Sequence, residues 1–111
     1  MTDADLKKVR ELLRTAENIK FSSHAEIKLA ARRIDRDLVL RHLKNPVVLT
    51  DAAFEEDKYP GEKYELYFYL SKRKILKVVV NFLGKDINVV TAHIINRKRL
   101  KWVEKWRKKR L

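Results

Sequence analysis

Cysteine is absent from the 111 residues of this chain, which excludes disulfide bonds, thiolate nucleophiles and thiolate metal sites. Glycine and proline occur only twice each, so the sequence has no flexible linker and no glycine-rich phosphate loop. The longest apolar stretch, residues 87–95, is much shorter than the ~20 residues that span a bilayer. The N-terminal segment is charged throughout and has no apolar core of a signal peptide. We therefore expect one compact cytoplasmic domain that does not contact membranes.

The histidine pattern also argues against a metal centre. The three histidines are His24, His42 and His93, and they show neither the H-x-x-x-H spacing nor a neighbouring carboxylate. The chain has no G-x-G-x-x-G motif and no nucleophile motif. We therefore predict that the protein uses no metal and no cofactor.

Positive charge dominates the composition. The chain has 27 Lys and Arg residues against 15 Asp and Glu residues, a net charge of +12. Residues 97–111 alone contain nine basic residues and one acidic residue. Such a charge attracts RNA, other nucleic acids or an acidic protein partner. The alternative is that the basic residues only form a solvated surface.

The first half of the chain has helical patterns. Ser23 and Glu26 match the S-x-x-E capping box at a helix start, and Asp35 can cap a later helix. Pro46 stops that helix, because the residue before a proline avoids the α conformation. The sequence predicts helices over residues 3–18, 23–33 and 35–44.

The second half of the chain alternates with a period of two, which is typical of strands. Strands are predicted over residues 47–57, 63–70, 74–83 and 87–95. The predicted class is α+β, with N-terminal helices packed on one face of a three- to four-stranded antiparallel meander and a basic C-terminal helix at 97–111. Residues 1–111 would form a single domain, in which residues 1–20 are an N-terminal helical extension.

Alternation assigns the strand residues to two faces of the sheet. One face is wholly apolar, and we expect the helices to cover it. The other face is predicted to be half-exposed and contains Tyr67, Tyr69, Lys77, Asn81, Thr91 and His93. Four of these residues also have a purely structural interpretation: the tyrosines are good strand formers, and the histidine and threonine could be partly buried residues with satisfied hydrogen bonds.

His24, Lys28 and Arg32 are spaced four residues apart, so a helix places them in one row. Like charges in a row repel each other. The row is therefore either a solvated helix face, with His24 bonding a loop carbonyl, or a surface that faces a negatively charged group.

Three segments resemble a family of small bacterial and archaeal domains: "HAEIKLAARRI" (24–34), "DRDLVLRHLKNP" (35–46) and "VVTAHIINRKR" (89–99). Members of that family have a His-Ala-x-x-Arg-x-x-x-Arg-Gly-Ile helix and a last strand that reads Val-Val-Thr. They are similar to the RelE/ParE and BrnT toxins, which share the barnase–colicin–RelE-like ribonuclease fold. The resemblance covers roughly residues 21–97. His24, Ala25, Arg32, Ile34 and Thr91 match the pattern, whereas Lys28 replaces an arginine and Arg33 replaces the glycine.

The resemblance implies a RelE-like domain that binds RNA and can act as a metal-independent endoribonuclease. Such cleavage needs a proton acceptor, a proton donor and cations around the phosphate. The implied catalytic residues are His24 and His93. The implied nucleic-acid-binding residues are Lys28, Arg32, Lys77, Tyr67, Tyr69, Thr91, Arg97 and Arg99.

Two other functions stay open on the sequence. The same cationic surface could bind nucleic acid without turnover. It could also bind an acidic antitoxin-like protein.

Overall fold

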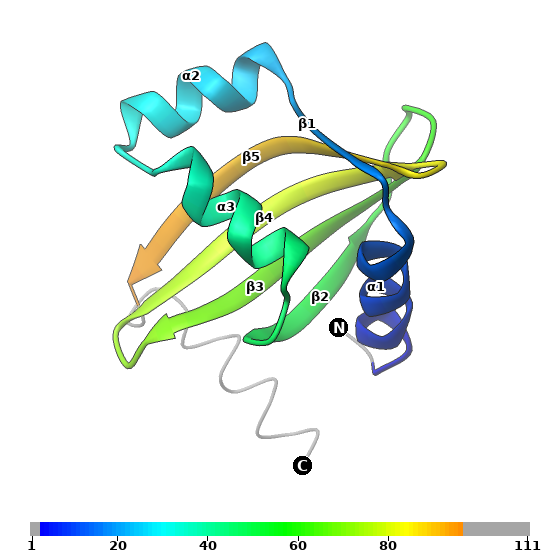
Figure 1. Ribbon diagram of the computed structural model, residues 1–111, viewed down its shortest axis with the longest axis horizontal. Coiled ribbons are helices and arrows are strands. Elements are labelled where there is room, and N and C mark those ends of the chain that lie inside the picture. The colour runs from blue at the N-terminus through cyan, green and yellow to red at the C-terminus, as the bar shows by residue number, and fades with distance from the viewer. Residues whose placement is uncertain (1–2, 97–111) are drawn as a thin grey trace.

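The computed structural model describes residues 3–96 as three helices and one five-stranded sheet (Figure 1). In chain order the elements are α1 (Asp3–Thr15), β1 (Asn18–Phe21), α2 (Ser23–Ala31), α3 (Arg36–Lys44), β2 (Leu49–Glu55), β3 (Glu62–Ser71), β4 (Lys74–Leu83) and β5 (Asp86–Asn96). The predicted C-terminal helix at 97–111, with Arg97 and Arg99, lies outside the described residues. Within residues 3–96, no helix is long and apolar enough to cross a membrane.

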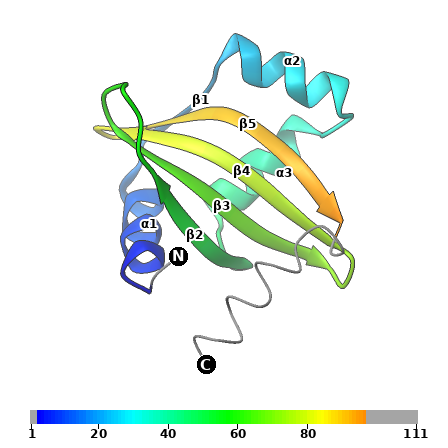
Figure 2. The ribbon, with the colours of Figure 1, turned by 180° about the vertical axis from the view of Figure 1, so that it is seen from behind.

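The helices α1 and α3 lie on one side of the sheet, as the two opposite views show (Figures 1 and 2). Val9 and Leu13 are spaced one helical turn apart on α1, and both are buried. Val39 and Leu43 repeat this spacing on α3. They pack against the apolar face of the sheet, which includes Leu66, Phe68, Leu76, Val78, Val80 and Ile87. The mixed α+β class and the helix-covered apolar face are therefore confirmed.

The sheet is mixed rather than antiparallel, because β1 was missed in the sequence. The strand order is β1-β5-β4-β3-β2, and β1 pairs in parallel with β5, whereas the other neighbours are antiparallel. The predicted first helix extended to Asn18, but α1 ends at Thr15 and Asn18 begins the strand. A four-residue strand is too short to show a period, and its partner lies 68 residues further along the chain, at Asp86.

Both ends of α2 are closed by local hydrogen bonds. Ser22, not Ser23, is the N-cap: its side chain accepts a hydrogen bond from the Ala25 N–H at 3.0 Å, so the predicted Ser23–Glu26 capping box is wrong. At the other end Ile34 N–H donates to the Leu29 carbonyl at 2.9 Å and Arg33 N–H to the Ala30 carbonyl at 3.2 Å. This pair of bonds is a Schellman motif, which places Arg33 in the left-handed region with φ 55°. Asp35 caps α3 as predicted.

Replacing Arg33 with glycine is expected to raise the free energy of unfolding by about 1 kcal/mol. A left-handed conformation costs an L-residue roughly 1–2 kcal/mol, and the larger entropy of glycine in the unfolded chain offsets part of this gain. Urea denaturation measures the difference. Arg33→Ala keeps the Cβ and is the matched control, with an expected change within about 0.5 kcal/mol. A glycine variant no more stable than the alanine variant would contradict this account.

A β-bulge in β5 changes which residues face the core. The register pairs Val79 with Thr91 and Val80 with Val89, so Val90 has no partner on β4. Simple alternation along residues 87–95 would group Val89 with Thr91 and His93. The bulge instead turns Val89 into the core and keeps Thr91 and His93 on the other face.

Candidate functional site

The polar residues of the second face form a row across three strands. Tyr67 on β3 lies opposite Lys77 on β4, which in turn lies opposite His93 on β5. Directly opposed residues of neighbouring antiparallel strands have Cβ atoms about 5 Å apart, so these side chains are neighbours. The sheet therefore brings together three residues that are far apart in the sequence.

Helix α2 adds two cations to this row, because its C-terminal end packs beside β5. The Nη1 atom of Arg32 donates to Thr91 Oγ1 at 3.0 Å and to the carbonyl oxygen of Ala92 at 2.8 Å. The Ala92 carbonyl lies beyond the part of β5 that β1 pairs with, so Arg32 supplies the donor that a longer β1 would provide. The bonds join the end of α2 to the sheet and place its Lys28–Arg32 row next to His93.

His93 is partly buried, and cations from α2 and β4 lie near it. Burial lowers the pKa of the His93 imidazole below its usual 6.5, and the nearby charges of Arg32, Lys77 and Lys28 lower this pKa further. All three cations lower the pKa because protonation of the imidazole would place another positive charge among them. His93 is therefore neutral near pH 7, the form that can accept a proton. We call these five residues the His93 cluster: Lys28, Arg32, Lys77, Thr91 and His93.

Glu65 orients the lysine of the cluster and was not singled out in the sequence. Its carboxylate lies 3.5 Å from Lys77 Nζ and accepts a hydrogen bond from the Tyr67 hydroxyl at 2.7 Å. Burial raises the pKa of the Tyr67 hydroxyl, and its hydrogen bond to the negatively charged Glu65 raises this pKa further. Alternation places Glu65 and Tyr67 on one face, but only the register between β3 and β4 shows that Lys77 is within reach.

The two predicted stacking tyrosines differ in exposure. Tyr67 is only 1% exposed and packs with Ile75 and Ile95 in a second, small apolar cluster. Tyr69 is 45% exposed and lies opposite Ile75. The ring of Tyr69 is therefore accessible to solvent, whereas Tyr67 is buried within the sheet face.

His24 is separate from the cluster. It lies in the first turn of α2 and is exposed, while Arg32 and Lys28 at the other end of this helix are the α2 residues that perturb His93. The helical row thus reaches the site with two of its three members. Among residues 3–96, no group of three or more His, Cys, Asp and Glu side chains comes close enough to hold a metal ion.

A family model described as a domain of unknown function (DUF4258) matches residues 21–94. The chain belongs to this family. The DUF4258 region begins at the last residue of β1 and contains the whole His93 cluster, whereas α1 lies outside it. The match confirms an uncharacterised small-domain family over nearly the expected range, and it does not test the resemblance to the RelE/ParE and BrnT toxins. No curated protein and no solved structure matches the chain.

Proposed function

We propose that this DUF4258 domain binds the phosphate backbone of RNA at the His93 cluster. The observation that supports this function is the position of three cations from α2 and β4 around a neutral, partly buried histidine. A phosphate group between them would gain charge-assisted hydrogen bonds and would relieve the repulsion among the cations. Tyr69 on the same face offers a ring for base stacking.

Arg32 is already oriented for this role. Its Nη1 atom is held by Thr91 and Ala92, so the guanidinium loses little further freedom when it binds. The planar guanidinium has further N–H donors, and two of them can bind one phosphate. Lys77 is held by Glu65 in the same way.

RNA cleavage without metal is the second candidate, and the neutral state of His93 favours it. The imidazole would take the proton of a 2′-hydroxyl, the 2′-oxygen would attack phosphorus, and the bond from phosphorus to the 5′-oxygen would break. The leaving 5′-oxygen would take its proton from solvent, because His24 lies outside the cluster. Arg32 and Lys28 would stabilise the charge that develops on the phosphorane. The resemblance to RelE/ParE and BrnT toxins supports this reaction.

A single assay tests both functions. The full chain is incubated with end-labelled single-stranded RNA at two salt concentrations, and bound and cleaved RNA are measured together. We expect binding that weakens as the salt concentration rises, because the basic side chains of the protein displace counterions from the phosphates when RNA binds. His93→Gln is expected to slow cleavage by at least ~100-fold, the usual contribution of a general base, and to leave binding near pH 7.5 nearly unchanged.

His24→Gln is the matched control for a surface histidine, and Lys28→Ala tests the cationic row. Lys28→Ala should weaken binding, whereas His24→Gln should not. Binding without cleavage would reject the ribonuclease and retain the RNA-binding function. Absence of salt-dependent binding in the folded wild-type protein would reject both.

A further inference from the structure

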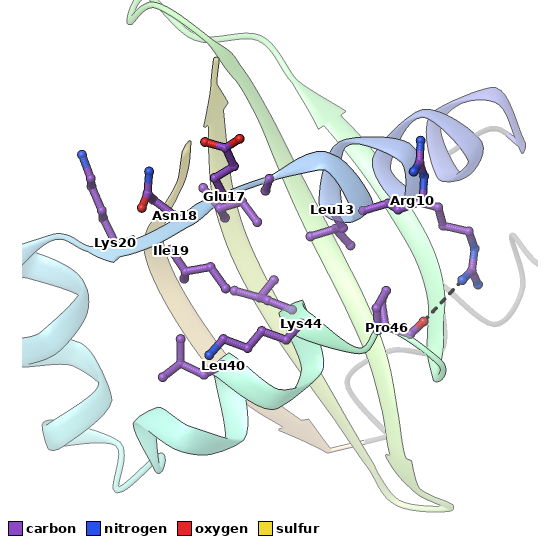
Figure 3. A pocket seen from close by; sticks show the side chains of 13 residues that line it. Arg10, Leu13, Glu17, Asn18, Ile19, Lys20, Leu40, Lys44 and Pro46 are labelled. Atoms are coloured by element: carbon purple, nitrogen blue, oxygen red, sulfur yellow. Dashed lines mark hydrogen bonds between the residues drawn. The ribbon is translucent and has the colours of Figure 1, made fainter. Parts of the chain in front are cut away.

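A slot with an aliphatic floor lies on the other side of the sheet from His93. It occupies about 770 Å³ between α1, β1 and α3 (Figure 3). Ile19 on β1 faces Leu40 and Lys44 on α3 across this slot. The apolar lining consists of Leu13, Ala16, Ile19, Leu40, Leu43 and Ile87. No aromatic side chain of the described residues lines it. The slot therefore offers aliphatic side chains a place to bury but gives nucleic-acid bases no ring to stack on.

The slot runs along the backbone of β1. Residues 16–20 all line it, although neighbouring side chains of a strand point to opposite faces. In Figure 3 the side chains of Asn18 and Lys20 point away from α3, so their main chain is what borders the slot. A ligand in the slot would thus lie beside the backbone of a strand.

Among residues 3–96, no strand pairs with the outer edge of that backbone. β1 is the first strand of the sheet order, with β5 as its neighbour on one side. Asn18 N–H donates to the Lys85 carbonyl at 3.3 Å and Ser22 N–H to the Val89 carbonyl at 3.2 Å. Every second residue of a strand points to the same side, so the N–H and C=O groups of Ile19 and Phe21 point away from β5. These groups can pair with an added strand.

The rim of the slot is mainly positive. Four basic residues line it against one acidic residue, Glu17: Arg10, Arg14, Lys20 and Lys44. Three of the four have contacts already. Arg14 forms an ion pair with Glu11. Lys20 Nζ lies 3.2 Å from Asp86 Oδ2. Arg10 donates hydrogen bonds to the carbonyls of Pro46 and Leu49. Lys44 has no ion-pair partner among the described residues and lies across the slot from Ile19. It is therefore the cation most available to a carboxylate.

We propose that the slot binds an extended, acidic segment of a partner protein, which adds a parallel or antiparallel strand to the free edge of β1. The main chain of the segment pairs with Ile19 and Phe21. An aliphatic side chain enters the slot above Leu13 and Leu40, and a neighbouring carboxylate reaches Lys44. Main-chain bonds supply affinity and the pocket supplies specificity, as in other cases of strand addition. His93 points to the opposite face, so RNA and this segment can bind at the same time.

The test uses the full chain and two short blocked peptides, one alternating glutamate with valine and the other alternating lysine with valine. NMR follows the amides of Ile19 and Phe21. We expect the glutamate peptide to shift these amides and to slow their hydrogen exchange, and the lysine peptide to do neither. Lys44→Glu should weaken the binding at least tenfold, whereas Lys58→Glu, a reversal in the β2–β3 loop, should leave it unchanged.

Ile19→Pro removes the outward N–H and leaves the amides that bond β5 intact, so it should abolish peptide binding without loss of RNA binding. The proposal is overturned if the glutamate peptide fails to bind, or if both peptides bind alike. It is equally overturned if RNA protects the two amides, or if the protein alone protects them at high concentration. The last result would identify a second copy of the chain as the occupant.

Discussion

Replacing Gly61 with alanine is expected to lower the free energy of unfolding by roughly 2–4 kcal/mol, the largest stability change that we predict for a single methyl group. Gly61 immediately precedes β3 and has a φ of +99°, a conformation in which an L-residue is strained. An added Cβ would also collide with Asn81 Oδ1 and would lie 2.7 Å from the Phe82 carbonyl oxygen. The carbonyl belongs to β4 and cannot move without disturbing the ladder.

The Asn81 side chain cannot easily turn away from the new methyl group. Its Nδ2 donates to the Pro60 carbonyl at 2.9 Å, which ties the β2–β3 loop to the polar face of the sheet. Turning the amide would break this bond, and its Oδ1 atom is already buried without a hydrogen-bond partner among the described atoms. The clash therefore adds to the backbone strain.

Gly84 provides the matched control for this prediction. It also has a positive φ, +60°, but a Cβ there would meet no atom within 4 Å. Gly84→Ala should therefore cost only the backbone strain, about 1 kcal/mol. Urea denaturation of both variants separates strain from collision. Equal losses at the two positions would show that the predicted contact at Gly61 is not made.

RNA affinity is expected to rise roughly tenfold when the pH is lowered from 7.5 to 5.5. Lys28 and Arg32 from α2 and Lys77 from β4 face His93, with Glu65 of β3 behind Lys77, and together with burial they keep the imidazole neutral when the site is empty. A bound phosphate reverses the sign of this field and accepts a hydrogen bond from an imidazolium. Binding therefore takes up a proton, and a tenfold change corresponds to a difference of one pKa unit between the bound and free states.

The same group makes the free protein less stable in acid. The pKa of His93 is lower in the folded state than its unfolded value near 6.5, so the unfolded chain binds more protons below that pH. The contribution of His93 to the free energy of unfolding is constant above pH 6.5, falls as the pH drops from 6.5 to the folded pKa, and is constant again below the folded pKa. RNA or inorganic phosphate should oppose this loss.

Filter binding with a short single-stranded RNA at pH 5.5, 6.5 and 7.5 and constant ionic strength measures the effect on affinity. Calorimetry in two buffers of different ionisation enthalpy counts the protons taken up. His93→Gln should remove the pH dependence and His24→Gln should keep it. An affinity that does not vary with pH in the wild-type protein would mean that the phosphate does not sit beside His93.

The apolar side chains were the most reliable guide to the fold. Three correct predictions depend on residues that are close in sequence. They are the buried spacing of Val9 and Leu13, the Asp35 cap, and the alternation along β3 and β4. Such local patterns report burial directly, because one turn of a helix or two residues of a strand return to the same face. They predicted the covered face of the sheet and the shared polar face of Lys77, Thr91 and His93.

Local patterns could not reveal contacts between distant segments. β1 exists because Asp86–Val89 offer it hydrogen bonds, and its four residues have no period of their own. The Val90 bulge depends on the register between β4 and β5, which alternation cannot count. Both features shape the proposed sites: β1 borders the slot, and the bulge turns Val89 into the core while Thr91 and His93 stay on the other face.

The sequence therefore determined the class of fold, the basic character and the residues for which we propose phosphate binding. Which of these residues meet was decided by tertiary structure alone. Arg32 reaches Thr91 because α2 packs beside the part of β5 that β1 does not pair with, and the same packing leaves His24 outside. Side-chain chemistry is set residue by residue, whereas distances between elements depend on how the whole chain satisfies its backbone hydrogen bonds and buries its apolar surface.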